Sequence, residues 1–280
     1  MPDTPFQQPI GMPFIELQTI DSTNNYALSQ IHAGLAQHGL VIFSHEQTTG
    51  KGQRGKKWAS ANHAGIAISI VIDPGTMHLS QQFQLSACTA VTLQRFFGKY
   101  AGKETKIKWP NDLYWKDRKA GGILIESGVG SKEAGGGNTE DGGGRTAAGG
   151  RRIESGVSRW QWAVIGIGVN INQTSFPGEL PNPVSLKQIT GKNYDTIELA
   201  KELCSLFNDE FEKLVNSRFE EIYAYYLSHL YKINEKVKLR KDNRVFETMV
   251  KSVSPGGRLI VEHGIEEEFD FGSVEWLINQ

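Results

Sequence analysis

Hydrophobic and polar positions along the chain follow two kinds of pattern. Short apolar or alternating runs predict strands at 14–20, 39–45, 66–72, 106–109, 113–115, 123–125 and 160–171. Apolar residues at helical spacing predict helices over 79–100, 194–215 and 219–230. A shorter helix over 24–33 follows Asp21, Ser22 and Thr23, all of which are residues that can cap a helix N-terminus. The pattern predicts a large domain that contains both helices and strands.

From residue 233 the pattern changes to short alternating strands, separated by a Pro255-Gly256-Gly257 turn. These strands are expected at 237–239, 245–253, 259–261 and 269–271. An all-β segment of this length predicts a small SH3-like β-barrel. We therefore place a larger domain at 14–232 and a second domain at 233–280. Residues 1–13 hold four prolines and are expected to form a flexible N-terminal arm. Ten of the 23 residues in 128–150 are glycine, which indicates a flexible insert between strands.

Composition narrows the classes of protein. The chain has 30 Lys and Arg against 31 Asp and Glu, so no overall field would attract DNA or an acidic membrane. Its only cysteines, Cys88 and Cys204, fall on predicted buried helix faces and are expected to be thiols of a reducing compartment. We find neither an N-terminal targeting signal nor an apolar run of about 18 residues. A soluble, cytoplasmic protein is expected.

The stretch 108–126, KWPNDLYWKDRKAGGILIE, brings candidate chemistry together on adjoining turns. Asn111 and Asp112 lie in a turn between two strands, and Lys119 precedes Ala-Gly-Gly at the start of a third. Lys119 is suited to stabilise charge on a phosphoryl or carboxylate oxygen, and Asp112 to hold a magnesium ion beside phosphates. The alternatives are a solvated lysine and a Pro-Asn-Asp sequence that only forms a turn. No zinc-type cluster or serine-hydrolase motif is found.

A second candidate is the glycine loop 48–58, in which Gly50, Gly52 and Gly55 match GxGxxG. A dinucleotide fold needs a helix after these glycines, but 56–64 is too short and too polar to cover a sheet. We therefore favour a loop whose backbone N–H groups and basic side chains bind an oligophosphate, with a solvated basic hairpin as the alternative. The basic residues are Lys51, Arg54, Lys56 and Lys57.

The strand 160–171 ends in a third candidate stretch, GIGVNI. Gly166 and Gly168 would allow a ligand or another backbone to approach closely, and Asn170 sits at the strand end. An apolar loop at 173–186 follows, which either folds over a bound ring or packs permanently.

Three stretches, GKGQRGKKW at 50–58, KWPNDLYWKDRKAGGILIE at 108–126 and GIGVNIN at 166–172, resemble the signature sequences of the biotin protein ligases, in the same order. The family is also called biotin-[acetyl-CoA-carboxylase] ligase or holocarboxylase synthetase. The resemblance implies an α+β fold, a mixed β-sheet packed by α-helices like that of class II aminoacyl-tRNA synthetases, with a small C-terminal SH3-like β-barrel. It also implies ATP and Mg²⁺ as cofactors, biotin as substrate, and a biotin carboxyl carrier protein domain as partner.

The resemblance further implies roles for individual residues. Catalytic roles fall to Lys119, Arg54 and Asp112, with Asp112 also a magnesium ligand. Biotin would contact Ser22, Thr23, Asn24, Gln47, Gly50, Lys51, Gly52, Gln53, Arg54, Trp58, Lys119, Gly122, Ile123 and Gly168. ATP would contact Arg54, Lys56, Trp58, Asn111, Lys119 and Asn170. Trp58 and the loop 176–184 would shield the mixed anhydride from water.

The chain departs from the family pattern at Lys51 and Gln53, where arginines are usual, and in the insert 128–150. Only about 20 residues precede Ser22, too few for a helix-turn-helix domain, so no DNA operator is expected. A monomer or homodimer is expected. The alternatives are a lipoate-protein ligase and a non-catalytic binding module built on the SH3-like domain.

Overall fold

The computed structural model describes residues 8–58, 62–130, 159–178, 180 and 182–278. Its larger part is a seven-stranded sheet with the order β1-β2-β3-β7-β6-β5-β4. The strands are β1 (Phe14–Ile20), β2 (Val41–Gln47), β3 (Gly65–Ile72), β4 (Thr105–Lys108), β5 (Asp112–Trp115), β6 (Arg118–Gly130) and β7 (Arg159–Asn170). Strands β1 and β2 pair in parallel, and the other pairs are antiparallel. The expected mixed sheet is confirmed.

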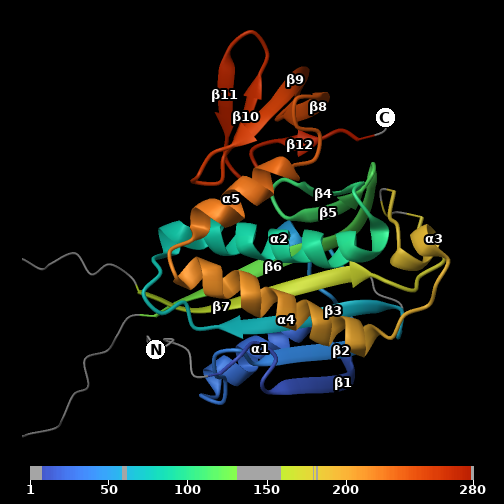
Figure 1. Ribbon diagram of the computed structural model, residues 1–280, viewed down its shortest axis with the longest axis vertical. Coiled ribbons are helices and arrows are strands. Elements are labelled where there is room, and N and C mark those ends of the chain that lie inside the picture. Colours follow the sequence, from blue (N-terminus) through green and yellow to red (C-terminus); the bar gives the residue numbers. More distant parts are fainter. Residues whose placement is uncertain (1–7, 59–61, 131–158, 179, 181, 279–280) are drawn as a thin grey trace, which may run out of the picture.

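Helices cover the two faces of this sheet unequally (Figure 1). On one face lies α1 (Thr23–His32), and on the other lie α2 (Gln82–Ala101), α4 (Thr196–Val215) and α5 (Phe219–Ser228). A short 3₁₀ helix, η2 (Leu79–Gln81), leads into α2. Among the described residues, we find no helix with the length and apolar character that a membrane crossing requires.

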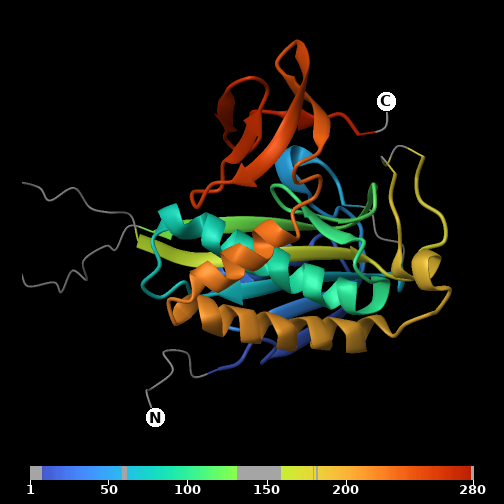
Figure 2. The ribbon, with the colours of Figure 1, turned by 45° about the horizontal axis from the view of Figure 1, so that its top comes forward.

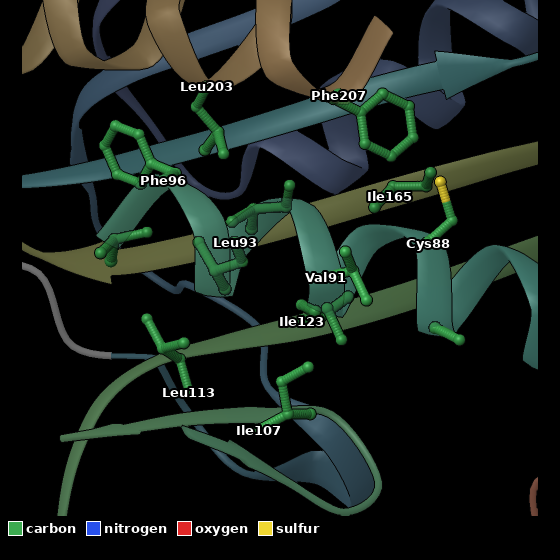
Figure 3. Close-up of a cluster of buried hydrophobic side chains, with 14 of the residues drawn as sticks. Cys88, Val91, Leu93, Phe96, Ile107, Leu113, Ile123, Ile165, Leu203 and Phe207 are labelled. Atoms are coloured by element: carbon green, nitrogen blue, oxygen red, sulfur yellow. The ribbon is translucent and has the colours of Figure 1, made fainter. Parts of the chain in front are cut away.

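Alternation along the strands divides the core between these faces. On β2, Val41 and Phe43 join the large core beneath α2 and α4, whereas Ile42 points to the α1 side. Figure 3 shows Val91 and Leu93 of α2 among Leu203 and Phe207 of α4 and Ile123 and Ile165 of the sheet. The face under α1 carries only a small apolar cluster, so part of it is available for other chemistry.

The strand pairing excludes the dinucleotide-binding fold. That fold needs parallel strands joined by a crossover helix, whereas β2 and β3 are antiparallel neighbours. The glycine loop between them contains a 3₁₀ turn, η1 (Gln53–Gly55), and no α-helix in its described part. The rejection of GxGxxG as a dinucleotide motif is confirmed.

Some predicted boundaries need correction. The described end of the arm predicted at 1–13 is not loose, because Ile10 is buried and its N–H donates to Asn208. Ser22, one of the three N-cap candidates, occupies the N-cap of α1 but makes no side-chain capping hydrogen bond. A five-residue helix, α3 (Leu186–Thr190), was missed because so short a helix shows no period; the Ser185–Gln188 capping box was its available signal.

The C-terminal part forms a second, antiparallel sheet with the order β11-β10-β9-β8-β12, which stands at one end of the molecule (Figure 2). Its strands are β8 (Lys236–Lys241), β9 (Arg244–Val253), β10 (Leu259–Glu262), β11 (Glu266–Phe269) and β12 (Glu275–Trp276). The strand expected at 269–271 in fact ends at Phe269, and Phe271 is half exposed in the following loop. The SH3-like classification and the domain boundary at 232–233 stay predictions. Most of the predicted insert 128–150 lies outside the described residues.

Candidate active site

The site lies on the face of the sheet that α1 only partly covers. On this face β6 contributes Gly122 and Glu126, and β7 contributes Gly166 and Gly168, with Gly122 opposite Gly168 in register. The three glycines replace side chains with open backbone, so other groups lie directly against the sheet. A Cβ on Gly166 would meet the Asn24 amide, and one on Gly168 would meet the Trp58 indole. Side chains, rather than a backbone, therefore make the close approach that these glycines predicted.

Polar side chains from α1 and two strands form a buried network over this face. Thr23 donates from its backbone N and its Oγ1 to Oε1 of Gln47, at 2.8 and 3.1 Å. Ser69 Oγ lies 2.8 Å from Thr23 Oγ1 and 2.5 Å from Asn24 Oδ1, and its single proton serves one of them at a time. Ser22 is buried beside them. The predicted residues Ser22, Thr23, Asn24 and Gln47 are thus brought together.

Glu126 extends the network to the glycine loop. Asn24 Nδ2 donates to Glu126 Oε2 at 2.7 Å, and Lys51 Nζ donates to Glu126 Oε1 at 3.4 Å. One carboxylate therefore ties α1 and the glycine loop to β6. Sequence reasoning missed Glu126 and Ser69. The signal for Ser69 was its position as a polar residue inside the apolar strand 65–72. The signal for Glu126 was a carboxylate on the same strand face as Gly122.

The most highly charged part of the site is built on the β4–β5–β6 hairpins. Lys119 Nζ lies 2.6 Å from Asp112 Oδ1, and Lys108 Nζ lies 3.8 Å from Asp112 Oδ2. Lys108 stands opposite Asp112 in the β4–β5 register. Burial lowers the pKa of Lys108 to about 8, although Asp112 opposes this shift. Sequence reasoning assigned Lys119 and Asp112 but not Lys108, whose charge in a buried strand was the available signal.

Ile123 is the point at which the turn and the glycine loop meet. Its carbonyl accepts from the side-chain amides of Asn111 and Gln53, and its N–H donates to the Asn111 carbonyl at 3.0 Å. Asn111 is buried, so its amide holds the turn beside Asp112. Gln53, which departs from the family pattern, is anchored to β6 by this bond.

Trp58 closes the glycine loop and lies on the sheet. The backbone N–H of Trp58 donates to the Gly50 carbonyl at 2.8 Å, and the Trp58 indole lies against Gly168. A Cβ on Gly50 would lie 2.5 Å from the backbone carbonyl oxygen of Trp58, so Gly50 needs to be glycine. Gly52 donates to the Lys56 carbonyl, which makes the loop a tight hairpin. The loop therefore lies over Gly168, and its closure over a bound carboxylate and phosphates stays a prediction.

Arg54 extends toward the loop that follows β11 in the C-terminal sheet. Its guanidinium lies 5.5 Å from the centre of the Phe271 ring and in contact with Gly272. Arg54 adopts a left-handed backbone conformation with φ 56°. Lys56 lies near enough to Lys108 to lower its pKa. Lys56 therefore connects the loop with the charged cluster, whereas Arg54 contacts the C-terminal part.

Asn170 is buried in the frame of the site. Its Nδ2 lies 3.2 Å from the carbonyl of Val184 and 3.4 Å from that of Lys119, and its Oδ1 accepts from Gln173. The backbone N–H of Val184 also donates to the carbonyl of Lys119, at 2.8 Å. The amide thus holds the apolar loop beside Lys119, and its predicted contact with ATP stays a prediction.

The surroundings of Asp112 do not fit the predicted magnesium ligand. Both carboxylate oxygens face ammonium groups, which would repel a divalent cation held there. No group of three or more His, Cys, Asp or Glu side chains suited to a metal occurs in the described part of the chain. The arrangement instead suits an anion, which the two lysines would attract.

Comparisons with known proteins show which proteins the chain resembles. Residues 16–136 match the model of the biotin/lipoate A/B protein ligase family. The chain is 26% identical over 256 residues to the bifunctional ligase/repressor BirA of Bacillus spizizenii, covering 90% of this chain and 70% of that protein. It is 29% identical to the biotin–[acetyl-CoA-carboxylase] ligase of Paracoccus denitrificans, covering 88% and 92%.

Solved structures show the same fold. The biotin protein ligase from Aquifex aeolicus, in complex with biotin and ATP, superposes with a TM-score of 0.72 at 22% identity, covering 95% of this chain and 99% of that one. The Leishmania major biotin protein ligase gives a TM-score of 0.53 at 19% identity. The signature stretches that these elements bring together, and the relatives matched over most of its length, indicate a ligase that is similar in sequence and fold to the biotin protein ligases.

Proposed function

We propose that the protein activates biotin with ATP and transfers it to one lysine of a biotin carboxyl carrier protein domain of a biotin-dependent carboxylase. The observation that carries the proposal is the meeting of two kinds of group on one sheet face. The network of Thr23, Gln47, Ser69 and Asn24 offers hydrogen-bond donors and acceptors. The Lys119–Asp112–Lys108 cluster offers cations.

The polar network favours biotin over lipoate. A ureido ring carries N–H donors and a carbonyl acceptor that this network can pair, whereas a dithiolane ring pairs with none of them. Burying unpaired polar groups against the dithiolane would cost affinity. The acid chain of biotin would run over Gly122 and Gly168 toward Lys119.

In the first step, a carboxylate oxygen of biotin attacks the α-phosphorus of ATP, and the bond from that phosphorus to the bridging oxygen breaks. Biotinyl-AMP forms and pyrophosphate leaves. Lys119 neutralises the negative charge that gathers between the carboxylate and the phosphate in the transition state. Arg54 and Lys56 attract the remaining phosphates from the glycine loop. Trp58 and the loop 176–184 keep water from the mixed anhydride.

In the second step, the amine of the carrier lysine attacks the biotinyl carbonyl carbon. The carbonyl–oxygen bond to AMP breaks, an amide forms, AMP leaves with the bonding electron pair, and the proton lost by the amine passes to solvent. Asp112 orients the incoming amine by accepting a hydrogen bond from it, and Asn111 holds the turn that carries Asp112.

The test is mass spectrometry of a biotin carboxyl carrier domain after incubation with the protein, ATP and biotin. A gain of one biotinyl group is expected, and a carrier whose target lysine is changed to arginine should gain none. Parallel incubations contain lipoate in place of biotin, with a lipoyl carrier domain. Lipoyl transfer without biotinyl transfer would contradict the proposal and identify a lipoate ligase, and no transfer of either group would favour a binding module.

A further inference from the structure

The charged cluster presents an electrostatic problem for the mechanism. Lys119 is held by Asp112 at 2.6 Å, and a cation already paired with a carboxylate attracts a further anion weakly. A single ion pair has no net charge to offer the reactants. The geometry around Asp112 contains a second ammonium group, Lys108, on its other oxygen. The three groups together therefore keep one net positive charge.

Lys108 is held in this position by aromatic rings. Its Nζ lies 5.3 Å from the centre of the Tyr114 ring and 5.2 Å from that of Trp276. Tyr231 packs against both rings, at 5.1 and 6.0 Å. Rings of this kind stabilise an ammonium group through their negative faces. Trp276 belongs to β12, so the C-terminal sheet supplies one wall of this enclosure.

The two lysines differ in their freedom to move. The side chain of Lys108 is 11% exposed, whereas that of Lys119 is 31% exposed. Lys108 is therefore fixed beside Asp112, and Lys119 is the ammonium group that can turn toward a ligand over Gly122. A Cβ on Gly122 would already contact Lys119 Nζ at 3.5 Å, so the absence of a side chain keeps this path open.

We propose that Lys108 is a positioning residue that serves as the resident counter-ion of Asp112, so that Lys119 is released to bind the anionic oxygens of the reactants. The inference rests on the proposed function, because it assigns to Lys119 the charge stabilisation of acid activation. Without the ammonium group of Lys108, Asp112 would hold Lys119 more tightly, and activation would slow. Lys108 itself need not touch the substrate.

The experiment is a double-mutant cycle between Lys108→Met and Asp112→Asn, measured as kcat for pyrophosphate release with ATP and saturating acid. Methionine keeps an unbranched chain between the rings and removes the charge. Lys108→Met should lower kcat about 10- to 100-fold in the wild-type background. In the Asp112→Asn background the same change should alter kcat less than about threefold, because no carboxylate remains to hold Lys119.

Lys106→Met is the matched control, since Lys106 lies on the same strand and loses the same charge, while its register partner is Tyr114 rather than Asp112. It should leave kcat within about twofold of wild type. Equal losses from Lys108→Met in both backgrounds, or an equal loss from Lys106→Met, would overturn the inference. If the methionine variant is unfolded at the assay temperature, Lys108→Gln is measured in the same cycle with the same expectations.

The cycle separates this inference from the proposed function when it is run with biotin and with lipoate. Release with lipoate and none with biotin would overturn the proposed substrate, while the cycle measured with lipoate would still decide the role of Lys108. Wild-type protein that releases pyrophosphate with neither acid would overturn both.

Discussion

The ammonium nitrogen of Lys119 lies 2.6 Å from Oδ1 of Asp112, although the two residues belong to different strands. Strands β5 and β6 are antiparallel neighbours with a register shift between Leu113 and Tyr114, next to the point where Asp112 stands opposite Gly122. This irregularity and the small side chains at 120–122 leave space for Lys119 to reach back to Asp112. The pair therefore results from the local geometry of the hairpin.

Lys119→Ala tests the role of this ammonium group. Loss of one preorganised charge stabiliser typically costs about 3–4 kcal/mol of transition-state energy, so pyrophosphate release should fall by roughly 10²- to 10³-fold. The side chain is partly exposed and no core contact is lost, so the thermal unfolding midpoint should change little. A fall in kcat of less than tenfold, in a variant that remains folded, would count against the assignment.

Substitutions at Glu126 distinguish its two hydrogen-bonding partners. Glu126→Ala leaves the amide nitrogen of the buried Asn24 without this acceptor and should cost about 1–3 kcal/mol of unfolding free energy. Glu126→Gln keeps an oxygen for Asn24 and loses the ion pair with Lys51, a partly exposed pair worth about 0–1 kcal/mol. Urea unfolding of both variants measures the difference. Equal losses would show that the Asn24 bond is not the stabilising contact.

Gly168→Ala tests whether the glycine loop needs open backbone beneath it. The new Cβ would overlap the Trp58 indole, so the loop must shift, at a cost of about 1–3 kcal/mol for overpacking. Weaker biotin binding by isothermal titration calorimetry and altered tryptophan fluorescence are expected. Gly128→Ala is the control, because its Cβ would meet only the Trp162 carbonyl, at 3.9 Å. Similar biotin affinities for the two variants would remove the proposed role of the Trp58–Gly168 contact.

Periodicity predicted most elements of the fold because burial imposes it. Strand 66–72 and helix 194–215 each have a buried face, and the structure has β3 at Gly65–Ile72 and α4 at Thr196–Val215. Short elements and termini were less predictable. Ile10 is buried, and its N–H donates to Asn208 of α4, which is distant in the sequence. No local pattern among the N-terminal prolines could indicate this burial.

Contacts in the site were predictable where both residues belong to one sequence motif. They were unpredictable where the two residues come from segments that are distant in the sequence. Lys119 and Asp112 share one hairpin, so their meeting followed from the spacing. Glu126 lies 102 residues from Asn24, and only the β3–β7–β6 pairing places it there. Trp276 reaches Lys108 from the second sheet. Alternation along a strand predicts which side chains share a face of that sheet, but not which residues of another sheet they will contact.

The contact between Arg54 and Gly272 gives a last prediction, which concerns how the C-terminal sheet acts on the glycine loop. Gly272 has φ +80°, and a Cβ there would coincide with the Arg54 guanidinium. Gly264 has φ +92° and nothing within 4 Å of its Cβ position, so Gly264→Ala carries a similar backbone strain without touching Arg54. Each substitution should lower the unfolding free energy by about 1 kcal/mol.

Their effects on ATP should differ. Gly272→Ala displaces the flexible end of Arg54, so the side chain must be ordered again when phosphates bind. Ordering one long side chain costs about 0.5–1.5 kcal/mol, which predicts a rise in the KM for ATP of roughly two- to tenfold. Gly264→Ala should leave this KM unchanged, and in an Arg54→Ala background the two glycine variants should behave alike. An equal KM for ATP in Gly272→Ala and Gly264→Ala would mean that the C-terminal loop does not position Arg54.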